Sequence, residues 1–291
     1  MALHTKNNTE PLGDGCLCPQ GSLDADLLRL CAGYRRTVAG RYAGATVDTL
    51  GELGPGPFQV SPKIDGQLGF LIADGDELIL GAPNGRVLCG SLPLLDEARK
   101  TLGARASGRT VLAGELFVIP EGGRPRVGAV VSSLSGGKEA AVKRLCFQAF
   151  DLVEDGALEG EGAHEAYTDR LGALEAYLEG GKRVKSITTE QAADAGAIKE
   201  AFAKWVDGGK AEGLIARSPA GRIIKVKPEF TLDLVVIGYT QRSEAPDQVG
   251  SLLLAFMRAD GSYQLAGACG NMGSDEQRAA FYTQLSAQHA D

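Results

Sequence analysis

The sequence predicts an α+β protein made of antiparallel sheets flanked by helices. Short apolar runs of strand length follow one another across tight turns, as at 67–73 and 77–82 around Ala73-Asp74-Gly75-Asp76. Segments with apolar residues at helical spacing separate these runs. Hairpins are more frequent than regular strand–helix–strand units, and this order favours antiparallel over parallel pairing.

The first part of the chain combines a polar lead with one helix. Residues 1–22 are polar and rich in glycine and proline, so we expect a flexible lead that ends with Ser22 as a helix cap. Apolar residues from Leu23 to about Tyr42 lie mostly at helical spacing and predict an amphipathic helix. Residues 46–57 then form a connection rich in glycine and proline.

Strands and helices are mixed irregularly in the middle of the chain. Strand patterns occur at 58–63, 67–73, 77–82, 110–119, 126–131 and 144–153, and as a hairpin of 212–217 with 222–227. Helical patterns occur at 92–102, 167–178 and 189–206. Residues 23–228 are therefore expected to form one domain.

A second, smaller domain is predicted at 229–291, beyond a hinge at Pro228 to Phe230. Three strands at 231–240, 251–258 and 262–267 precede a helix that begins near residue 274. An OB-fold barrel uses five strands. We therefore expect a partial, OB-like β domain.

Composition and charge exclude some classes of protein. No apolar run approaches the ~20 residues that cross a bilayer, and the first ten residues are polar where a secretory signal is apolar, so we expect a cytoplasmic protein with no membrane partner. The net charge of -7 argues against a non-specific coat on nucleic acid. A local basic groove remains open, because Arg217, Arg222, Lys225 and Lys227 lie close together in the sequence.

The six cysteines give no metal-binding pattern in the sequence. Only Cys16 and Cys18 are close, and no second pair of cysteines or histidines follows at the spacing of a zinc site. We expect reduced thiols, as is usual inside cells.

Five short motifs occur in a fixed order. Each is weak alone, since a lysine at a strand end is usually a solvated charge and a glutamate can mark a strand edge. They are Lys63-Ile64-Asp65-Gly66, Gly114-Glu115-Leu116, Phe147-Gln148-Ala149-Phe150-Asp151-Leu152, Glu212-Gly213-Leu214-Ile215 and Ile224-Lys225-Val226-Lys227-Pro228. Together with Thr231 to Gly238 they resemble the covalent nucleotidyltransferase superfamily of ATP-dependent polynucleotide ligases and mRNA capping enzymes. The resemblance covers roughly residues 58–270 and leaves the first 57 unassigned.

The resemblance implies a ligase-type adenylation domain in which Lys63 takes AMP from ATP as a phosphoramidate. An attacking amine must be uncharged, so cationic neighbours that lower its pKa would assist. Lys225 and Lys227 alternate with apolar residues on a strand, so both point to one face and are expected at the α-phosphate. All three lysines are thus catalytic and nucleotide-binding candidates, and Asp65 is expected to position the nucleophile.

The resemblance also implies a metal and a base site. Carboxylates hold Mg²⁺ or Mn²⁺ at phosphates, and Glu115 and Glu212 are the candidates, with Glu115 also a candidate for the ribose. Phe150 matches the position that stacks on adenine in such ligases. Leu214 or Ile215 would close the other side of the base, and Leu214 is the residue we assign to the nucleotide.

The sequence departs from the ligase pattern at three places. An arginine usual after the lysine motif is replaced by Leu68, and a second usual arginine is absent from Ala82-Pro83-Asn84-Gly85, where Arg86 is the available substitute. The C-terminal basic motif and further OB strands are also missing before Asp291. Either the chain is a fragment, or another polypeptide completes the barrel, or this domain ends differently.

The favoured function is an ATP-dependent DNA ligase that seals 3′-hydroxyl and 5′-phosphate ends at nicks. An RNA ligase of the same superfamily is the alternative, favoured by Leu68 and by the lack of a large N-terminal DNA-binding domain. A third hypothesis is a non-catalytic subunit that keeps the fold and needs a partner. A capping enzyme is disfavoured because Glu212-Gly213 stands where those enzymes usually have Asp-Gly, and no nicotinamide-binding motif points to NAD.

Overall fold

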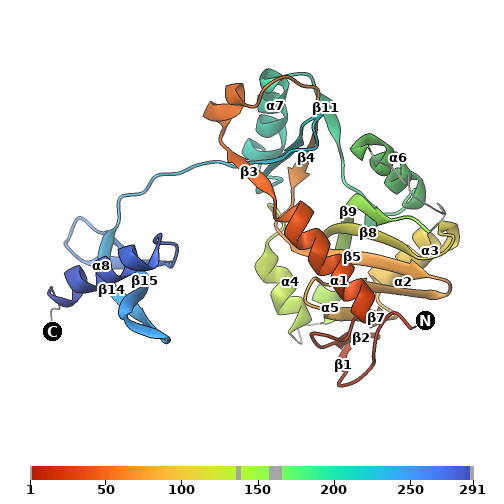
Figure 1. Cartoon of the computed structure of the whole chain (residues 1–291), viewed down its shortest axis with the longest axis horizontal. Coiled ribbons are helices and arrows are strands. Elements are labelled where there is room, and N and C mark those ends of the chain that lie inside the picture. Colours follow the sequence, from red (N-terminus) through yellow and green to blue (C-terminus); the bar gives the residue numbers. More distant parts are fainter. Residues whose placement is uncertain (1, 136–138, 157–165, 289–291) are drawn as a thin grey trace. The chain divides into compact units, whose positions relative to one another are not determined.

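The computed structural model describes residues 2–135, 139–156 and 166–288. The chain divides between Pro228 and Glu229 into two compact units, each described here by itself. The N-terminal unit contains two sheets and most of the helices, and the C-terminal unit contains three strands and a helix (Figure 1). The predicted α+β class, with mainly antiparallel sheets, is confirmed.

An eight-stranded sheet forms the larger part of the N-terminal unit. All neighbouring strands pair antiparallel except the last two, β9 and β10, which are parallel. In spatial order the strands are β1 (Glu10–Leu12), β2 (Gly15–Cys18), β7 (Val87–Gly90), β6 (Glu77–Gly81), β5 (Gln67–Asp74), β8 (Thr110–Val118), β9 (Leu145–Glu154) and β10 (Val184–Ser186).

Helices cover both faces of this sheet, because successive side chains of its central strands point to opposite sides. Phe70 and Ile72 of β5 pack in one core with α1 (Ala25–Tyr34), which runs across the sheet (Figure 1). Leu71 of β5 packs in a second core on the other side. The helices that contribute to this second core are α2 (Pro93–Lys100), α3 (Leu102–Arg105), α4 (Val127–Leu134), α5 (Glu139–Val142) and α6 (Tyr167–Tyr177).

A five-stranded sheet contains the strands with the lysine motifs. Its order is β11 (Glu190–Ala192), β4 (Phe58–Lys63), β12 (Gly213–Arg217), β13 (Ile223–Val226) and β3 (Tyr42–Ala45). Only β13 and β3 pair in parallel within this sheet. One face packs apolar side chains against α7 (Ala195–Phe202), with Phe58 and Val60 of β4 and Leu214 of β12 in that core. The other face is free for polar side chains.

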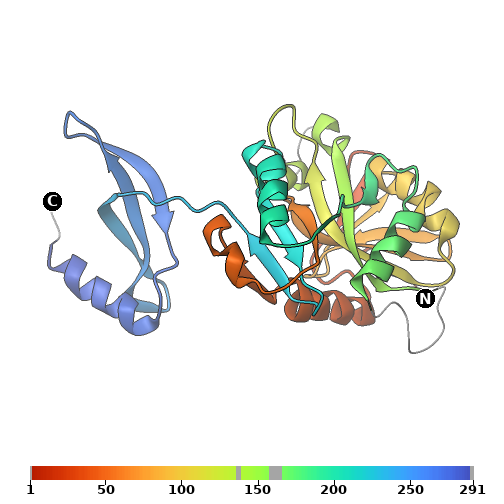
Figure 2. The same ribbon diagram turned by 90° about the horizontal axis from the view of Figure 1, so that it is seen from above.

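The C-terminal unit is an antiparallel meander with one helix, drawn in blue in Figure 2. Its strands are β14 (Val235–Arg242), β15 (Ala245–Met257) and β16 (Tyr263–Cys269), and α8 spans Asp275–Ser286. Ser274 and Gln277 form a capping box that begins α8. Three strands are what the sequence analysis expects here, and the assignment as a partial OB domain stays a prediction.

The expectation of a flexible lead at residues 1–22 is wrong. Glu10–Leu12 and Gly15–Cys18 are strands β1 and β2, which extend the eight-stranded sheet at β7. Leu12 and Cys18 are buried, so these strands gain hydrophobic contacts that a flexible segment would lack. The helix that follows begins with Asp24 as its cap in place of Ser22, since the Asp24 carboxylate accepts from two backbone amides of the first turn.

Two further elements differ from the sequence prediction. The expected strand at 126–131 is part of helix α4, because Val127, Val130, Val131 and Leu134 repeat at helical spacing and bury Val130 and Leu134. The expected helix at 189–206 begins later, since residues 190–192 pair with β4 and Asp194 caps α7. No helix in the described ranges is long and apolar enough to cross a membrane.

The expectation of six reduced cysteines is wrong for one pair. The register of β2 and β7 places Cys16 opposite Cys89, with their Cα atoms 5.1 Å apart, and the two form a disulfide. The cysteines at 18, 31, 146 and 269 are free.

Candidate active site

A cavity of about 580 Å³ in the N-terminal unit brings residues of both sheets together. From the five-stranded sheet it is lined by Lys63, Ile215 and Lys225, and from the eight-stranded sheet by Glu115 and Phe150. The end of α1 and the turn after it supply a third wall, which includes Tyr34, Arg35, Arg36 and Gly40. Residues from all five sequence motifs therefore line one space.

Strand register explains why these side chains meet. Lys63 lies opposite Gly213, and Ile215 lies opposite both Ser61 and Lys225. Because cross-strand partners project to the same side of a sheet, these residues share one face. The residues between them, such as Leu214, project into the core with α7. One face of the sheet thus holds the fold together while the other presents charge to the cavity.

Glu212 joins two of the candidate lysines. Its two carboxylate oxygens form separate ion pairs with the Nζ atoms of Lys63 and Lys227. The backbone supports this arrangement, since the Glu212 amide donates to the Lys63 carbonyl oxygen at 3.0 Å. Burial alone would raise the pKa of Glu212, but hydrogen bonds from both lysines outweigh it and lower the pKa. Glu212 is therefore ionised at neutral pH and holds Lys63 in place.

Lys225 projects into the same space and is held by an aromatic ring. Its Nζ lies 3.5 Å from the centroid of the Tyr42 ring on the neighbouring strand β3. Burial, together with the charges of Lys63 and Lys227, lowers the pKa of Lys225. The three lysines thus repel one another electrostatically, and an anion in the cavity would relieve that repulsion.

Glu115 faces the lysines from the opposite sheet. The turn after Lys63 brings the Gly66 backbone against β8, where a Cβ on Gly66 would lie 2.3 Å from the Leu116 carbonyl oxygen. The Gly66 amide donates to the Glu115 carboxylate. Burial raises the pKa of Glu115 to about 7, although the charge of Lys63 opposes this rise. A bound cation would favour the ionised form of this carboxylate.

Phe150 and Ile215 are among the apolar residues that line the cavity. Near them the Arg217 guanidinium lies between two rings, 4.3 Å from the centroid of Tyr167 and 5.8 Å from that of Phe150. Apolar surface formed by aromatic and aliphatic side chains suits a nucleobase. Leu214, which the sequence analysis assigned to the nucleotide, is fully buried in the other core and does not line the cavity. Strand alternation assigns that position to Ile215.

Comparison with known proteins supports the resemblance inferred from the motifs. No family model matches the chain. In sequence it is 29% identical to DNA ligase C2 of Mycolicibacterium smegmatis over 255 residues, which cover 84% of this chain and 69% of that protein. It is 27% identical to DNA ligase C of Mycobacterium tuberculosis, covering 75% of this chain and 63% of that protein. It is 31% identical to the multifunctional non-homologous end joining protein LigD of Pseudomonas aeruginosa, and the match covers 73% of this chain and 25% of that protein.

Solved structures agree on the fold. A Lig E DNA ligase structure matches 82% of this chain and 86% of its own with a TM-score of 0.57 and 17% identity. A structure described as Pmar-Lig_PreS3 matches 85% of this chain and 60% of its own, with a TM-score of 0.65 and 18% identity. The chain has a ligase-type nucleotidyltransferase fold. The resemblance to DNA ligases predicted from the five motifs is thereby confirmed. This ligase-type chain spans about two thirds of the length of the first two relatives and a quarter of the third.

Three other positions singled out in the sequence, at 65, 68 and 86, lie differently from the lysines. Asp65 follows β4 in the turn and makes no hydrogen bond or ion pair within the described ranges, so its positioning role stays a prediction. Leu68 lines the cavity at the position of the usual arginine and lies opposite Glu115. Arg86 does not line the cavity and donates to Gln67 Oε1 at 2.7 Å. Arg86 therefore does not replace either missing arginine in this arrangement.

Sequence reasoning missed the contribution of the N-terminal segment. Tyr34, Arg35 and Arg36 line the cavity at the end of α1, and Tyr42 contacts Lys225 from β3. Tyr34 also donates to Asp151 Oδ2 at 2.7 Å, which ties α1 to strand β9 next to Phe150. The available signal was the Tyr-Arg-Arg run at the end of an amphipathic helix, since two adjacent arginines there favour an anion-binding role.

The pKa of Glu115 predicts a specific dependence of stability on pH. Because its pKa is raised in the folded chain, the folded state binds more protons than the unfolded state between pH 4.5 and about 7. The stability contributed by protonated Glu115 is thus present below this window and is lost as pH rises through it, by at most about 3 kcal/mol. Urea unfolding of wild type and Glu115→Gln across this range measures the effect as a difference, and parallel pH profiles would contradict it.

Substitutions at 214 and 215 test the corrected assignment of the base contact. Leu214→Ala should lower the free energy of unfolding by about 2–5 kcal/mol, since it empties a fully buried site. Ile215→Ala should leave stability nearly unchanged but weaken ATP binding several-fold, because its side chain lines the cavity. Urea unfolding and ATP titration of both variants provide the comparison. If ATP binding were weaker in Leu214→Ala and unchanged in Ile215→Ala, Leu214 would again be assigned to the nucleotide.

Proposed function

We propose that the chain is an ATP-dependent polynucleotide ligase, and that DNA is its substrate. The observation that supports this most directly is the cluster of Lys63, Glu212, Lys225 and Lys227 beside a cavity with an aromatic wall. AMP would pass from ATP to Lys63, then to a 5′-phosphate at a nick. A 3′-hydroxyl would finally displace AMP and seal the strand.

In the first step the uncharged Nζ of Lys63 attacks the α-phosphorus of ATP. A nitrogen–phosphorus bond forms, the bond from the α-phosphorus to the bridging oxygen breaks, and pyrophosphate leaves while the amine proton passes to water. Glu212 positions Nζ through their ion pair. Lys225 would stabilise the charge that develops on the phosphoryl oxygens, and the charge of Lys227, whose side chain is 47% exposed, would assist the departing pyrophosphate.

The residues present also fit a divalent cation. Glu115 lines the cavity and Glu212 pairs with Lys63, which lines the same cavity. Carboxylate oxygens are the ligands that Mg²⁺ and Mn²⁺ prefer. The ion would neutralise phosphate charge when bound. Glu212 would then exchange a lysine partner for the metal.

DNA is proposed over RNA because the relatives are named DNA ligases and the Lig E structure is described as binding DNA with a minimal scaffold. An RNA ligase is the second candidate, since Leu68 replaces the arginine usual in DNA ligases. We place the activity in the cytoplasm. The C-terminal unit has a sheet of three strands. A protein partner that completes this unit is also part of the proposal.

The test uses the whole chain with labelled ATP and Mg²⁺, followed by a nicked DNA duplex or RNA ends. Acid-stable label on the protein and sealing of the DNA nick are expected. Label with sealing of RNA ends alone would favour the RNA ligase. Label without sealing of either would indicate that a partner is required. Absence of label would contradict the proposed activity and favour a non-catalytic subunit.

A further inference from the structure

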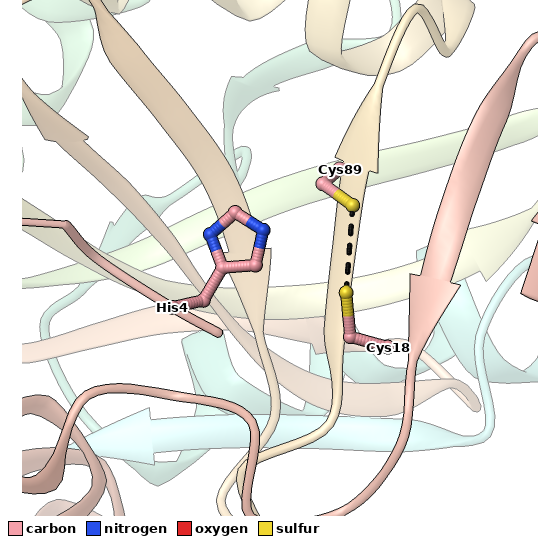
Figure 3. Close-up of side chains that lie close together, drawn as sticks. All are labelled: His4, Cys18 and Cys89. Carbon is pink, nitrogen blue, oxygen red and sulfur yellow. Dashed lines mark hydrogen bonds between the residues drawn. The ribbon is translucent and has the colours of Figure 1, made fainter. Parts of the chain in front are cut away.

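A second group of chemically active side chains lies on the eight-stranded sheet, apart from the lysines. Cys16 and Cys18 are two residues apart on β2, so their side chains project to the same face. The neighbouring strand β7 places Cys89 opposite Cys16. His4 lies over the same strands, in the segment that precedes β1 (Figure 3). Three thiols and one imidazole thus come from three separate parts of the chain.

Three of these four side chains lie at the distances of a metal site. The ligand atoms of His4, Cys18 and Cys89 all lie within 4.8 Å of one another. The sulfur atoms of Cys18 and Cys89 are 3.6 Å apart. Two thiolates on one tetrahedral zinc ion, with bonds of about 2.3 Å, are separated by about 3.8 Å. The observed sulfur separation needs almost no adjustment to reach that value.

His4 is the observation that points to a ligand. Only 7% of the residue is exposed, and its Nε2 has no hydrogen-bond partner within the described part of the chain. Nδ1 lies 3.0 Å from a carboxylate oxygen of Glu77, whose other oxygen accepts from the Leu3 amide at 3.1 Å. Figure 3 shows a ring nitrogen directed toward the two sulfur atoms. A carboxylate behind a histidine is a common second partner in zinc sites, where it fixes the ring orientation.

We propose that the reduced chain binds one zinc ion through Cys16, Cys18, Cys89 and His4. Three cysteines and one histidine are a common ligand set for structural zinc, and all four positions are then filled by the protein. Binding releases the protons of the three thiols as zinc–sulfur bonds form. The site is structural, since no coordination position is left for a substrate, and it differs from the carboxylates proposed for Mg²⁺.

The disulfide between Cys16 and Cys89 is the alternative use of the same sulfur atoms. A disulfide sulfur is not a thiolate, so zinc and the disulfide exclude each other at Cys89. A phosphine reductant converts one form to the other by supplying two electrons, and two protons come from water. The sequence offers no reason to expect zinc, because no second pair of cysteines or histidines follows Cys16 and Cys18 at the spacing of a zinc site. Cys89 is 71 residues from Cys18, and only the sheet register brings them together.

Zinc at this position would attach the N-terminal segment to the sheet. His4 precedes β1 and forms an isolated bridge with Leu23, where the Thr5 amide donates to the Ser22 carbonyl oxygen and the Asp24 amide donates to the Leu3 carbonyl oxygen. A metal that bonds His4 to two strands makes that segment part of the same cooperative unit. Removal of zinc should therefore release residues 2–9 before it affects the cavity.

The test measures zinc in the whole chain, purified with a phosphine reductant and then dialysed against a weak chelator. We expect one zinc ion per chain by mass spectrometry of the metal content, and loss of most of it in Cys18→Ser and His4→Ala. Cys269→Ser is the matched control, because this free cysteine lies in the other unit and its variant should keep the zinc. Zinc-free wild type, or unchanged zinc content in Cys18→Ser, would overturn the proposal.

A second measurement on the wild type does not depend on how the variants fold. Co²⁺ added to the reduced, zinc-free chain should give the visible bands of tetrahedral cobalt and the near-ultraviolet bands of thiolate ligation. Zinc should then displace the cobalt, and Mg²⁺ should not. Cobalt spectra typical of six oxygen ligands, or no spectrum, would overturn the proposal. Neither measurement uses ATP or DNA, so the outcome is independent of the proposed ligase activity.

Discussion

Lys63→Ala should abolish covalent labelling of the protein by ATP, with a loss of more than roughly a thousand-fold in the rate of label transfer. The side chain provides the nucleophilic nitrogen. Of the two lysines that line the cavity, Lys63 and Lys225, Lys63 is the one that pairs with Glu212 and lies in the lysine motif. Labelled ATP with Mg²⁺, followed by acid denaturation and separation of the protein, measures the bound label.

Two variants accompany this measurement. Lys63→Arg keeps the positive charge beside Glu212 but lacks a nucleophilic amine, so it should fold and remain unlabelled. Lys199→Ala removes an exposed lysine from α7 and should be labelled like the wild type. Label that survives Lys63→Ala in a folded protein would show that another residue is the nucleophile.

Glu212→Gln should slow label transfer by about a hundred-fold while leaving the fold intact. The substitution keeps the shape of the side chain but removes the charge that Lys63 and Lys227 share. Both ammonium groups would lose their ionic partner, and the proposed metal site would lose a carboxylate. The rate of label transfer under single-turnover conditions, measured at several Mg²⁺ concentrations, separates a metal-binding defect from mispositioning of the lysine.

Glu190→Gln is the matched control for this substitution. Glu190 belongs to the same sheet and pairs with the exposed Lys204, outside the residues that line the cavity. This variant should behave like the wild type in labelling. A normal rate in Glu212→Gln would mean that the carboxylate has neither of the roles assigned to it.

Much of the site could be predicted because its residues lie in short motifs on strands. Period-two alternation correctly placed Lys225 on one face of β13 and Ile224 in the core. The same alternation could not tell whether Leu214 or Ile215 faces the cavity, since both are apolar. That choice depends on pairing with β4 and β13, which brings Ile215 opposite Ser61 and Lys225.

Features that depend on distant pairing were beyond the sequence. Strands β1 and β2 are short and contain glycine and proline, so local composition suggested a lead rather than part of a sheet. Helix α4 contains three valines, which are strong strand formers, so local preference favours a strand there. Burial against the second core decides in favour of the helix. In each case contacts with remote residues outweighed the local preference.

The order of strands in the five-stranded sheet has a consequence for synthesis on the ribosome. β4 pairs only with β11 and β12, and β3 pairs only with β13, which ends at Val226. When Lys63 leaves the ribosome its strand therefore has no partner, and more than a hundred residues must follow before β11 arrives. The eight-stranded sheet lacks this delay at its centre, because β5, β6 and β7 are consecutive. During synthesis Lys63 thus lies on an unpaired strand. The face that would bind ATP is completed only as the last part of the N-terminal unit leaves the ribosome.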